Sequence, residues 1–256
     1  MLPYERQELI LEALNKERFL KIKELLDLTN SSLTTLRRDI NYLSESGKIR
    51  KSRGGILLVE QREREEASFL YRDREKLYKT EKERIGRAAQ RYIEDRDFIF
   101  LLNGTTTISV ARNLFSDKQI TIITNGIDIV SALRDRPNVE VILLGGIVDY
   151  PNYVMTGPMV LKELDDLHAT KLISGAGGIT EEKGITIYPY MVSAYYQKIV
   201  DMVERVIIVA DHSKFGRNAL VQATALDNVD TIITDEAVPE KYLQLLRQKQ
   251  IETIIS

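Results

Sequence analysis

The chain of 256 residues contains no cysteine and only two histidines, His168 and His212, which lie far apart in the sequence. Disulfide bridges and thiolate metal sites are therefore excluded, and a zinc site is not expected. No apolar run approaches the roughly 20 residues that cross a bilayer, and the first residues lack the basic-then-apolar pattern of a secretory signal. These absences favour a cytoplasmic protein with no membrane partner, no cofactor and no metal.

A strong net charge is also missing, since the formal value is −2. The average hides an asymmetry along the chain. Residues 1–59 hold 11 Lys and Arg against 8 Asp and Glu, whereas the remainder holds 25 against 30. The length suits two domains, and a basic first part on an acidic body is typical of a DNA reader attached to something else.

The basic first part has the periodicity of three amphipathic helices. Apolar residues recur at helical spacing in three stretches, residues 9–14, 22–26 and 33–43. Gly47 is expected to end the third helix, and residues 49–59 have the pattern of two short strands around a Gly-Gly turn. Three helices followed by a hairpin predict a winged helix-turn-helix domain over residues 1–59.

The composition and periodicity of the chain change at residue 60 and again at residue 84. Residues 60–83 are almost all polar or charged and predict a partly helical connector. From residue 84 onward, short β-branched runs alternate with helical segments. The runs are residues 98–102, 120–124, 139–144, 171–174, 206–210, 231–234 and 253–255. This alternation predicts an α/β domain over residues 84–256, whose mostly parallel sheet binds ligands at the carboxyl ends of its strands.

The third helix of the first domain carries side chains suited to DNA. Ser32 is placed to cap the helix, and its apolar stripe faces inward. Thr34, Arg38 and Asn41 project away from this stripe. We expect base-edge contacts from Arg38 and Asn41, and phosphate contacts from Ser32, Thr35 and Arg37. In the following hairpin, phosphate contacts are expected from Arg50, Lys51 and Arg53.

Two simpler interpretations stand beside this one. Asp39 lies beside the apolar stripe, where a structural pairing with an arginine is favoured over a base contact. The helix as a whole could be a surface helix whose charges are only solvated. The capping Ser32, the apolar stripe, the helix-ending Gly47 and the basic hairpin occur together. This combination favours DNA binding.

The motifs of the whole chain resemble those of the DeoR-type regulators of sugar metabolism. The resemblance spans about residues 4–236 and rests on Ser32–Ile40, Gly47, Arg50, Gly54-Gly55, Asn103–Thr107, Thr124-Asn125, Leu144–Gly146, Gly157-Pro158, Gly175–Gly178 and Ala210–Gly216. It implies a winged helix-turn-helix joined to a sensor domain that resembles sugar-phosphate isomerases. It also implies a repressor that releases or alters its DNA contact when a phosphorylated sugar binds.

The expected effector site begins at the end of the first strand of the sensor. Asn103, Gly104, Thr105, Thr106 and Thr107 lie between a strand and a helix, where free N–H groups and hydroxyls can hold a phosphate. A turn without a ligand is the alternative. The resemblance implies further ligand contacts from Asp211 and Lys214. The alternative is that Asp211 only caps a helix and that Lys214 is a solvated loop residue. Pocket walls or simple turns are expected at Asn125, Gly145, Gly146 and Gly175.

Two departures from the family pattern bear on chemistry. Asn103 stands where the sensor loop usually begins with aspartate, and the tyrosine-rich segment 188–196 has no acidic residue. Neither place supplies the carboxylate base that sugar isomerisation needs, so we expect no enzyme. The alternatives are an isomerase-like enzyme with an appended DNA-binding domain and an interaction scaffold without a ligand.

The predicted function is therefore a repressor of carbohydrate-metabolism genes. Its expected partners are a double-stranded DNA operator, a small phosphorylated sugar and further copies of itself. Because single winged helix-turn-helix domains bind weakly, a homo-oligomer, as a dimer or a tetramer, is expected to act on repeated half-sites.

Overall fold

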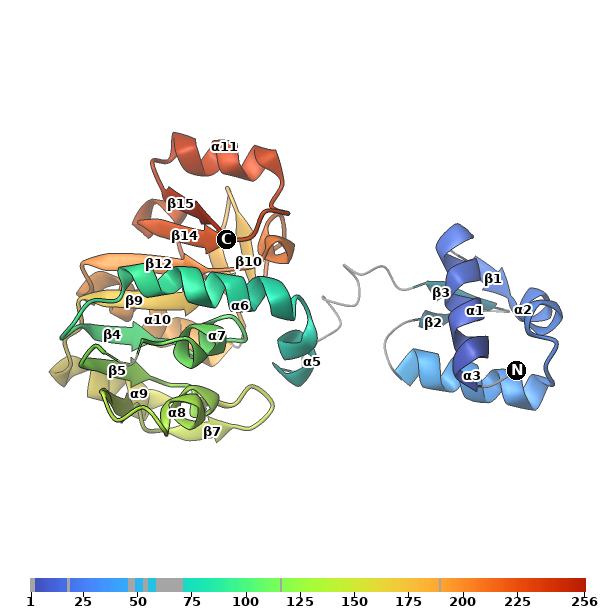
Figure 1. The fold of residues 1–256 in the computed structure, drawn as a ribbon, viewed down its shortest axis with the longest axis horizontal. Helices are drawn as coiled ribbons and strands as arrows, with labels where there is room; N and C mark the ends of the chain where they lie inside the picture. Colours follow the sequence, from blue (N-terminus) through green and yellow to red (C-terminus); the bar gives the residue numbers. More distant parts are fainter. Residues whose placement is uncertain are drawn as a thin grey trace. The chain divides into compact units, whose positions relative to one another are not determined.

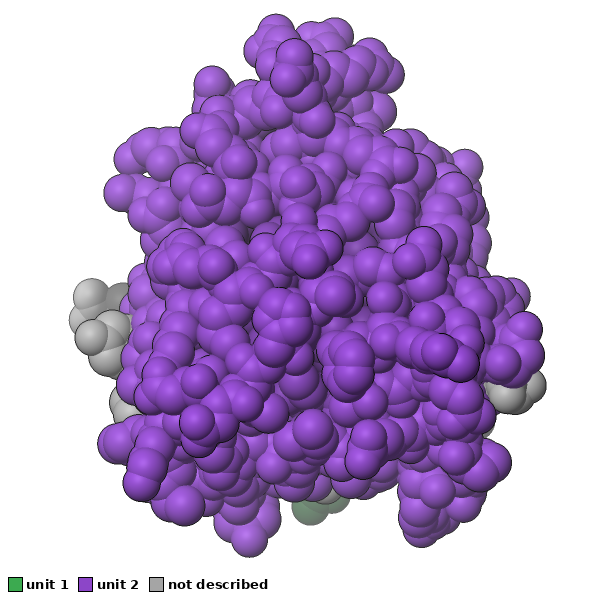
Figure 2. Space-filling view, turned by 90° about the vertical axis from the view of Figure 1, so that its left-hand side faces the viewer, with its two compact units in different colours: residues 1–69 green, residues 70–256 purple. Residues whose placement is uncertain are grey.

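The computed structural model describes residues 3–17, 19–45, 49–52, 55–58, 71–115, 117–188 and 190–256. Contacts divide the chain into two compact units, residues 1–69 (unit 1) and residues 70–256 (unit 2), which are coloured separately in Figure 2. No helix in the described ranges is long and apolar enough to cross a membrane. Each unit has a hydrophobic core of its own.

Unit 1 is a winged helix-turn-helix, as predicted (Figure 1). Its helices are α1 (Pro3–Lys16), α2 (Ile22–Thr29) and α3 (Leu33–Glu45), and its strands are β1 (Phe19–Lys21), β2 (Ile49–Ser52) and β3 (Gly55–Leu58). The strands form an antiparallel sheet in the order β1-β3-β2. The strand β1 was not anticipated, because three residues are too few to carry a periodic signal.

The centre of unit 2 is a seven-stranded sheet in which every neighbouring pair is parallel. The strands are β4 (Phe98–Leu101), β5 (Ile120–Thr124), β6 (Val139–Leu143), β9 (Lys171–Gly175), β12 (Arg205–Val209), β14 (Thr231–Thr234) and β15 (Glu252–Ile255). All seven runs expected from the sequence become these strands. The order across the sheet is β15-β14-β12-β9-β4-β5-β6.

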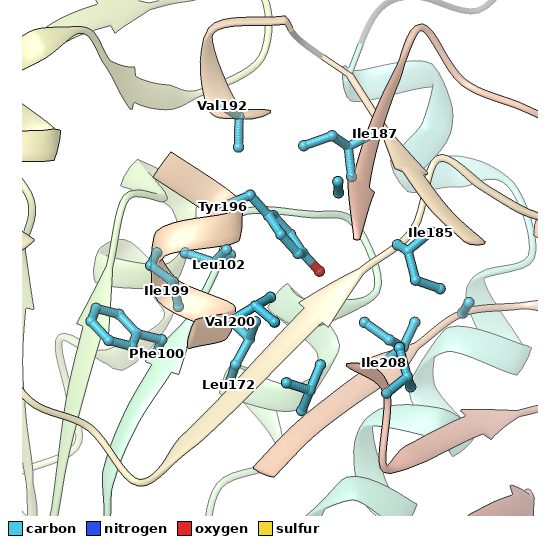
Figure 3. Close-up of a cluster of buried hydrophobic side chains, with 14 of the residues drawn as sticks. Phe100, Leu102, Leu172, Ile185, Ile187, Val192, Tyr196, Ile199, Val200 and Ile208 are labelled. Carbon is cyan, nitrogen blue, oxygen red and sulfur yellow. The ribbon is translucent and has the colours of Figure 1, made fainter. Parts of the chain in front are cut away.

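Helices cover both faces of this sheet, because alternate residues of each strand point to opposite sides. Ile99 and Leu101 share one apolar cluster with α6 (Lys79–Ala88), α7 (Thr107–Arg112) and α8 (Ile127–Leu133). Phe100 and Leu102 share the other with α9 (Pro158–Glu163), α10 (Tyr190–Met202) and α11 (Glu240–Gln248). Figure 3 shows side chains of α10, Tyr196 among them, in this second cluster.

Short antiparallel strands complete unit 2. They are β7 (Ile147–Asp149) with β8 (Val154–Thr156), and a three-stranded sheet of β10 (Gly178–Thr180), β11 (Gly184–Ile187) and β13 (Val221–Thr224). The sequence did not indicate them, because each has only three or four residues.

The first described element of unit 2 is the short helix α5 (Tyr71–Lys76). Tyr71 is 1% exposed, and Lys82 of α6 is 2% exposed. The Lys82 ammonium donates to the carbonyls of Arg74 and Leu77, over 2.5 and 2.6 Å, near the carboxyl end of α5. The expected connector of residues 60–83 therefore differs from the observed division. Its described part, residues 71–83, packs within unit 2, and residues 60–70 lie outside the described residues.

Candidate functional site

The helix α3 begins at the residue expected to cap it. The hydroxyl of Ser32 accepts a hydrogen bond from the Thr35 backbone N–H at 3.2 Å, and the Ser32 carbonyl accepts from Leu36 N–H at 2.9 Å. The apolar stripe of Leu36, Ile40 and Leu43 is buried in the core of unit 1. This burial fixes which face of α3 points outward.

The outward face of α3 is polar and basic. Thr34, Arg37, Arg38 and Asn41 are exposed, as the helical periodicity predicted. Thr35 is half-buried, and its hydroxyl lies 2.9 Å from the Ser32 hydroxyl. The side chains of two of the expected wing residues, Arg50 and Lys51 of β2, and the whole of Arg53 lie outside the described residues.

Asp39 holds α3 against α1. Its carboxylate accepts from the Arg6 guanidinium at 2.5 and 3.2 Å, and from the Gln7 side-chain amide at 3.1 Å. The two charged side chains are only 10% and 4% exposed, and the hydrogen bond raises the pKa of Arg6. The predicted structural pairing with an arginine is confirmed. Asp39 is thus turned away from the face that would meet DNA.

The strand order of unit 2 brings the expected effector residues to one edge of the sheet. β4, β5 and β6 follow one another outward, and β9 then returns to the other side of β4. The ends of β4 and β9 form a switch point, where open parallel sheets bind ligands. Along this edge stand Asp211 after β12, Gly175 at the end of β9, Asn103 after β4, Asn125 after β5 and Gly145 after β6.

Residues 103–107 form the loop from β4 to α7 at this switch point. The backbone N–H groups of Gly104, Thr105 and Thr106 donate no backbone hydrogen bond within the described part of the chain. Thr107, in contrast, is fully buried, and its hydroxyl donates to the Gly104 carbonyl at 2.9 Å. Thr107 therefore shapes the loop, while the three preceding N–H groups offer donors for an anion.

Asn103 is held by two other asparagines. Its backbone N–H donates to Asn125 Oδ1, and its Nδ2 donates to the Asn152 carbonyl, both at 2.9 Å. Asn125 in turn donates from Nδ2 to the Tyr195 hydroxyl at 2.5 Å. Asn103 Oδ1 is buried and accepts no hydrogen bond from the described residues. This amide oxygen is an open acceptor in the place where the resembled family usually has an aspartate carboxylate.

Asn152 and Tyr195 were not anticipated as parts of this site. The side chain of Tyr195 is fully buried. Burial raises its pKa, so the hydroxyl stays protonated and can also donate to the Met155 carbonyl at 3.3 Å. The only signal for Asn152 is its place after Pro151, which indicates a turn but not the loop that the turn would meet.

Asp211 has the capping role that was one of the two interpretations of it. Its Oδ1 accepts from the Ser213 N–H at 3.1 Å and from the Ser213 hydroxyl, which caps the short 3-10 helix η3 (His212–Lys214). Its Oδ2 is buried and accepts no hydrogen bond from the described residues. Because a buried carboxylate oxygen without a donor is costly, Oδ2 is suited to a donor that a ligand brings.

The residues after Asp211 have separate roles. His212 is structural, since its Nδ1 lies 2.9 Å from Asp235 Oδ1 and its ring meets the Tyr78 ring edge-on at 4.6 Å. Lys214 is half-buried at the end of η3, and its backbone N–H donates to the Asp211 carbonyl at 3.1 Å. Among the described residues, no group of three or more His, Asp and Glu side chains is arranged to hold a metal ion.

The three glycines expected as pocket walls or turns have different surroundings. Gly145 and Gly146 follow β6, two strands from β4 and about 10 Å away at ordinary strand spacing. Gly145 N–H donates to Glu163 Oε2 at 2.7 Å, and Gly146 has a φ of 150° with the Thr156 carbonyl 2.4 Å from where a Cβ would lie. These contacts favour the turn interpretation for both. Gly175 is next to the switch point, and a Cβ there would meet only the Val209 carbonyl oxygen, at an ordinary contact distance of 3.9 Å.

A separate cavity of about 390 Å³ lies beside α5, α7 and α8. Its lining includes Tyr71, Arg112, Asp128 and Tyr153, and none of the expected effector residues. Acidic and basic side chains both line it, so it does not favour an anion. The switch point is the stronger candidate site.

Comparison with known proteins assigns each unit to a domain family. Residues 6–62 match the DeoR-like helix-turn-helix domain, and residues 78–236 match the DeoR C terminal sensor domain. The second match alone spans more than half of the chain and begins next to α6.

Curated relatives are similar over nearly their whole length. The HTH-type transcriptional regulator IolR of Bacillus subtilis (strain 168) is 32% identical over 90% of this chain and 90% of its own. The transcriptional repressor GlcR of the same organism is 30% identical over 98% and 96%. The glycerol-3-phosphate regulon repressor of Escherichia coli (strain K12) is 28% identical over 97% of each chain.

Solved structures are more distant. Ribose 5 phosphate isomerase A from Neisseria gonorrhoeae has a TM-score of 0.40 and 15% identity, with 54% of each chain covered. The eIF2B delta structure from Chaetomium thermophilum has a TM-score of 0.46 and 13% identity, and it covers 82% of this chain and 74% of that one.

Proposed function

Because the chain belongs to the DeoR family of transcriptional regulators, we propose that it represses genes of carbohydrate metabolism and that a phosphorylated sugar modulates its operator binding. The observation that carries the DNA-binding half is α3, whose apolar stripe is buried and whose opposite face exposes Arg37, Arg38 and Asn41. The names of two relatives support repression and a phosphorylated effector. One relative is a transcriptional repressor, and the other is a repressor of a glycerol-3-phosphate regulon.

In this proposal α3 lies in the major groove of duplex DNA. Arg38 reads a guanine and Asn41 an adenine, the bases that suit their donors and acceptors, and Thr34 contacts a neighbouring base edge. Arg37 and Thr35 contact phosphates, which set the position of the helix without reading sequence.

The start of α3 and the wing hold the DNA backbone. The Ser32 hydroxyl already caps α3, so its phosphate contact comes from the N-terminus of the helix. Arg50, Lys51 and Arg53 supply positive charge from the wing, which makes binding dependent on salt.

The effector binds at the ends of β12, β9 and β4. Its phosphate meets the N–H groups of the loop 103–107, and Asp211 Oδ2 accepts from a sugar hydroxyl. Lys214 contacts the same ligand from η3, and Gly175 brings no side chain into the site. The free donors of the loop and the unpartnered Asp211 Oδ2 support this placement.

Operator binding requires more than one copy of the chain. One winged helix-turn-helix makes few contacts, so a dimer or tetramer places two or more of them on repeated half-sites. The effector changes DNA affinity only if it binds the two arrangements of the oligomer unequally. DNA must then weaken effector binding by the same factor.

The sensor is proposed to bind without catalysis. Moving a proton between sugar carbons needs a carboxylate base beside the carbonyl. Asn103 offers a neutral amide, and one oxygen of Asp211 is engaged by Ser213. Turnover of a sugar phosphate by the purified protein would replace this proposal with the isomerase-like alternative.

The decisive experiment is an electrophoretic mobility shift with DNA from upstream of the protein's own gene. A panel of sugar phosphates is added in turn, and the matching sugars without phosphate are the controls. We expect retardation without effector, and loss or change of retardation with one phosphorylated member. If dilute buffer yields no retarded fragment, with or without the panel, the proposal is wrong.

The variant Gly104→Val tests the phosphate loop separately. A Cβ at residue 104 would lie 3.1 Å from Thr107 Oγ1, and the further methyl groups of valine would crowd the free N–H groups. We expect the effector response to disappear while operator affinity and melting temperature stay unchanged. Gly104→Ala adds one methyl group and should give an intermediate response. A normal response in Gly104→Val would remove the loop from the site.

A further inference from the structure

The turn between β7 and β8 contacts the effector loop through a backbone carbonyl. The Asn152 carbonyl accepts a hydrogen bond from Asn103 Nδ2 at 2.9 Å. Asn103 is the first residue of the loop 103–107, whose following three N–H groups are the donors proposed for the effector phosphate. The direction of the Asn152 carbonyl therefore helps to set the position of this loop.

A residue in an unfavourable conformation sets the direction of this carbonyl. The carbonyl belongs to the peptide that joins Asn152 to Tyr153, and Tyr153 has a φ of 53°. A bulky residue with a Cβ seldom adopts this left-handed conformation, which persists only where the surrounding structure enforces it. Relaxation of Tyr153 to a negative φ would rotate the peptide and turn the carbonyl away from Asn103.

Helix α5 contacts both residues of this peptide. Tyr71 is 1% exposed, and its ring lies 5.5 Å from the Tyr153 ring. Arg74 donates from Nη2 to Asn152 Oδ1 at 3.0 Å. Residues three apart lie on the same side of a helix, so one side of α5 meets two consecutive residues of the turn.

Further hydrogen bonds fix the rest of the turn. The Asp149 carboxylate accepts from the Asn152 backbone N–H at 3.3 Å and from Asn152 Nδ2 at 3.0 Å. The Tyr153 carbonyl accepts from the Ile127 N–H at the start of α8, at 3.0 Å. The side-chain amide of Asn152 is thus held at both ends, at Nδ2 by Asp149 and at Oδ1 by Arg74.

Two other contacts attach α5 to the rest of unit 2 without touching this turn. The Lys82 ammonium donates to the carbonyls of Arg74 and Leu77. Arg112 of α7 pairs with Glu75 of α5, with 3.1 Å between Nη2 and Oε1. Attachment alone therefore does not explain why α5 also holds the turn that meets the effector loop.

We propose that Arg74 and Tyr71 are positioning residues of the effector site. Through Asn152 and Tyr153 they hold the loop 103–107 in the conformation that binds phosphate. This assignment rests on the proposed function. A loop that is held in its binding conformation before the ligand arrives loses less conformational entropy on binding. Both positioning residues precede residue 78, where the match to the sensor domain begins, so the site extends into the segment that follows unit 1 in the chain.

The test is a titration of the full-length protein with inorganic phosphate, followed by NMR, with chloride at equal ionic strength as the reference. The signals observed are the backbone amides of residues 104–106 and the side-chain amide of Asn103. Loss of one hydrogen bond predicts about 3- to 10-fold weaker phosphate binding by Arg74→Gln. The Asn103 side-chain signal should shift in this variant even without phosphate. Arg74→Lys keeps a donor for Asn152 and should recover part of the affinity.

The matched control is Arg112→Gln. It removes the ion pair of α5 with α7 and leaves the hydrogen bond from Arg74 to Asn152 in place. Its phosphate affinity and its Asn103 side-chain signal should equal those of the unchanged protein. Equal phosphate affinity of Arg74→Gln and Arg112→Gln overturns the assignment, and so does an unshifted Asn103 signal in Arg74→Gln.

Two substitutions of Tyr153 test the backbone conformation directly. Tyr153→Gly and Tyr153→Val both lose the ring and its contact with Tyr71. Glycine adopts a positive φ without strain, whereas the β-branched valine disfavours it, so Tyr153→Gly should bind phosphate at least about threefold more tightly than Tyr153→Val. Equal affinity of these two variants would show that the left-handed residue does not position the loop, which also overturns the assignment.

Melting temperatures separate positioning from a structural role. Arg74→Gln should lower the melting temperature no more than Arg112→Gln does. A lower melting temperature with unchanged phosphate affinity is the signature of a merely structural contact and contradicts the assignment. If Arg74→Gln does not fold, Asn152→Ala is measured in its place, because it removes the acceptor of Arg74 and should cause the same loss.

The mobility shift distinguishes failure of this assignment from failure of the proposed function. If the unchanged protein responds to a sugar phosphate while Arg74→Gln and Arg112→Gln bind phosphate equally, the positioning role is wrong and the proposed function stands. If the unchanged protein responds to no sugar phosphate, the proposed function fails. If phosphate moves no signal of residues 103–106 in the unchanged protein, the loop is not a phosphate site and the assignment fails with it.

Discussion

The two units of this regulator place their proposed binding side chains in opposite surroundings. In unit 1, Arg37, Arg38 and Asn41 project from α3 into solvent. In unit 2, Asn125 and Asp211 are buried at the ends of strands. The ligands explain the contrast, because duplex DNA approaches an outer surface whereas a small ligand must be enclosed to be bound tightly.

Buried polar groups also differ between the units. In unit 1, the buried Asp39 carboxylate is fully used by Arg6 and Gln7, and it fixes α3 on α1. In unit 2, Asn103 Oδ1 and Asp211 Oδ2 are buried and have no partner among the described residues. The satisfied carboxylate of unit 1 serves architecture, whereas the two unsatisfied oxygens of unit 2 lie at the sheet edge where a ligand is proposed to bind.

The largest expected effect tests the architectural pair of unit 1. Asp39→Asn leaves the Arg6 guanidinium buried without a counter-charge. We expect unit 1 to lose about 3 kcal/mol of stability. This value lies at the lower end of the range for breaking a buried ion pair, because Arg6 keeps some contact with water. Hydrogen exchange with mass spectrometry on the full chain should show faster exchange in α1 and α3.

Unit 2 supplies the internal control for this variant. Exchange in α10 should stay unchanged, since that helix belongs to the core of the other unit. Asp27→Asn removes the same charge from an exposed position of unit 1 and should leave both units unchanged. Equal exchange in Asp39→Asn and Asp27→Asn would show that the pair does not hold α3.

The next effect concerns the exposed face of α3. Arg38→Ala should weaken operator binding by roughly 1–3 kcal/mol and relax base preference at one position, if Arg38 reads a guanine. Binding to a set of operators with single base changes measures this. Lys51→Ala is the comparison, and it should weaken all sequences alike and reduce the salt slope by about one. Unchanged base preference in Arg38→Ala would reassign Arg38 to the phosphates.

The smallest effect concerns the enclosed site of unit 2. Tyr195→Phe removes the acceptor of Asn125 Nδ2, and we expect a loss of about 1 kcal/mol in stability together with a weaker effector response. Tyr196→Phe removes the hydroxyl of the adjacent buried tyrosine, which belongs to the apolar cluster, and should leave the response intact. Thermal melts and the mobility shift measure the two quantities. An equal response in both variants would separate Tyr195 from the site.

Local pattern was enough for most of the fold. The 3.6-residue period of Leu36, Ile40 and Leu43 already defined both faces of α3, because a helix repeats its own geometry. Leu33, expected in the same stripe, is exposed at the first position of the helix. The β-branched runs likewise located all seven strands of the parallel sheet, whose inner strands β4, β5, β9, β12 and β14 are largely buried and mostly apolar. The short strands such as β1 and β7 escaped notice, since three residues carry no period.

The side-chain contacts between these elements could not be predicted from the local sequence. Nothing near Asp39 in the chain indicated Arg6, 33 residues away, and nothing near Asn103 indicated Asn152 or Arg74. These contacts arise where strand order and helix packing bring distant segments together. A periodic pattern records which side of an element is buried, whereas the identity of the residue it meets is set by long-range packing that no local spacing encodes.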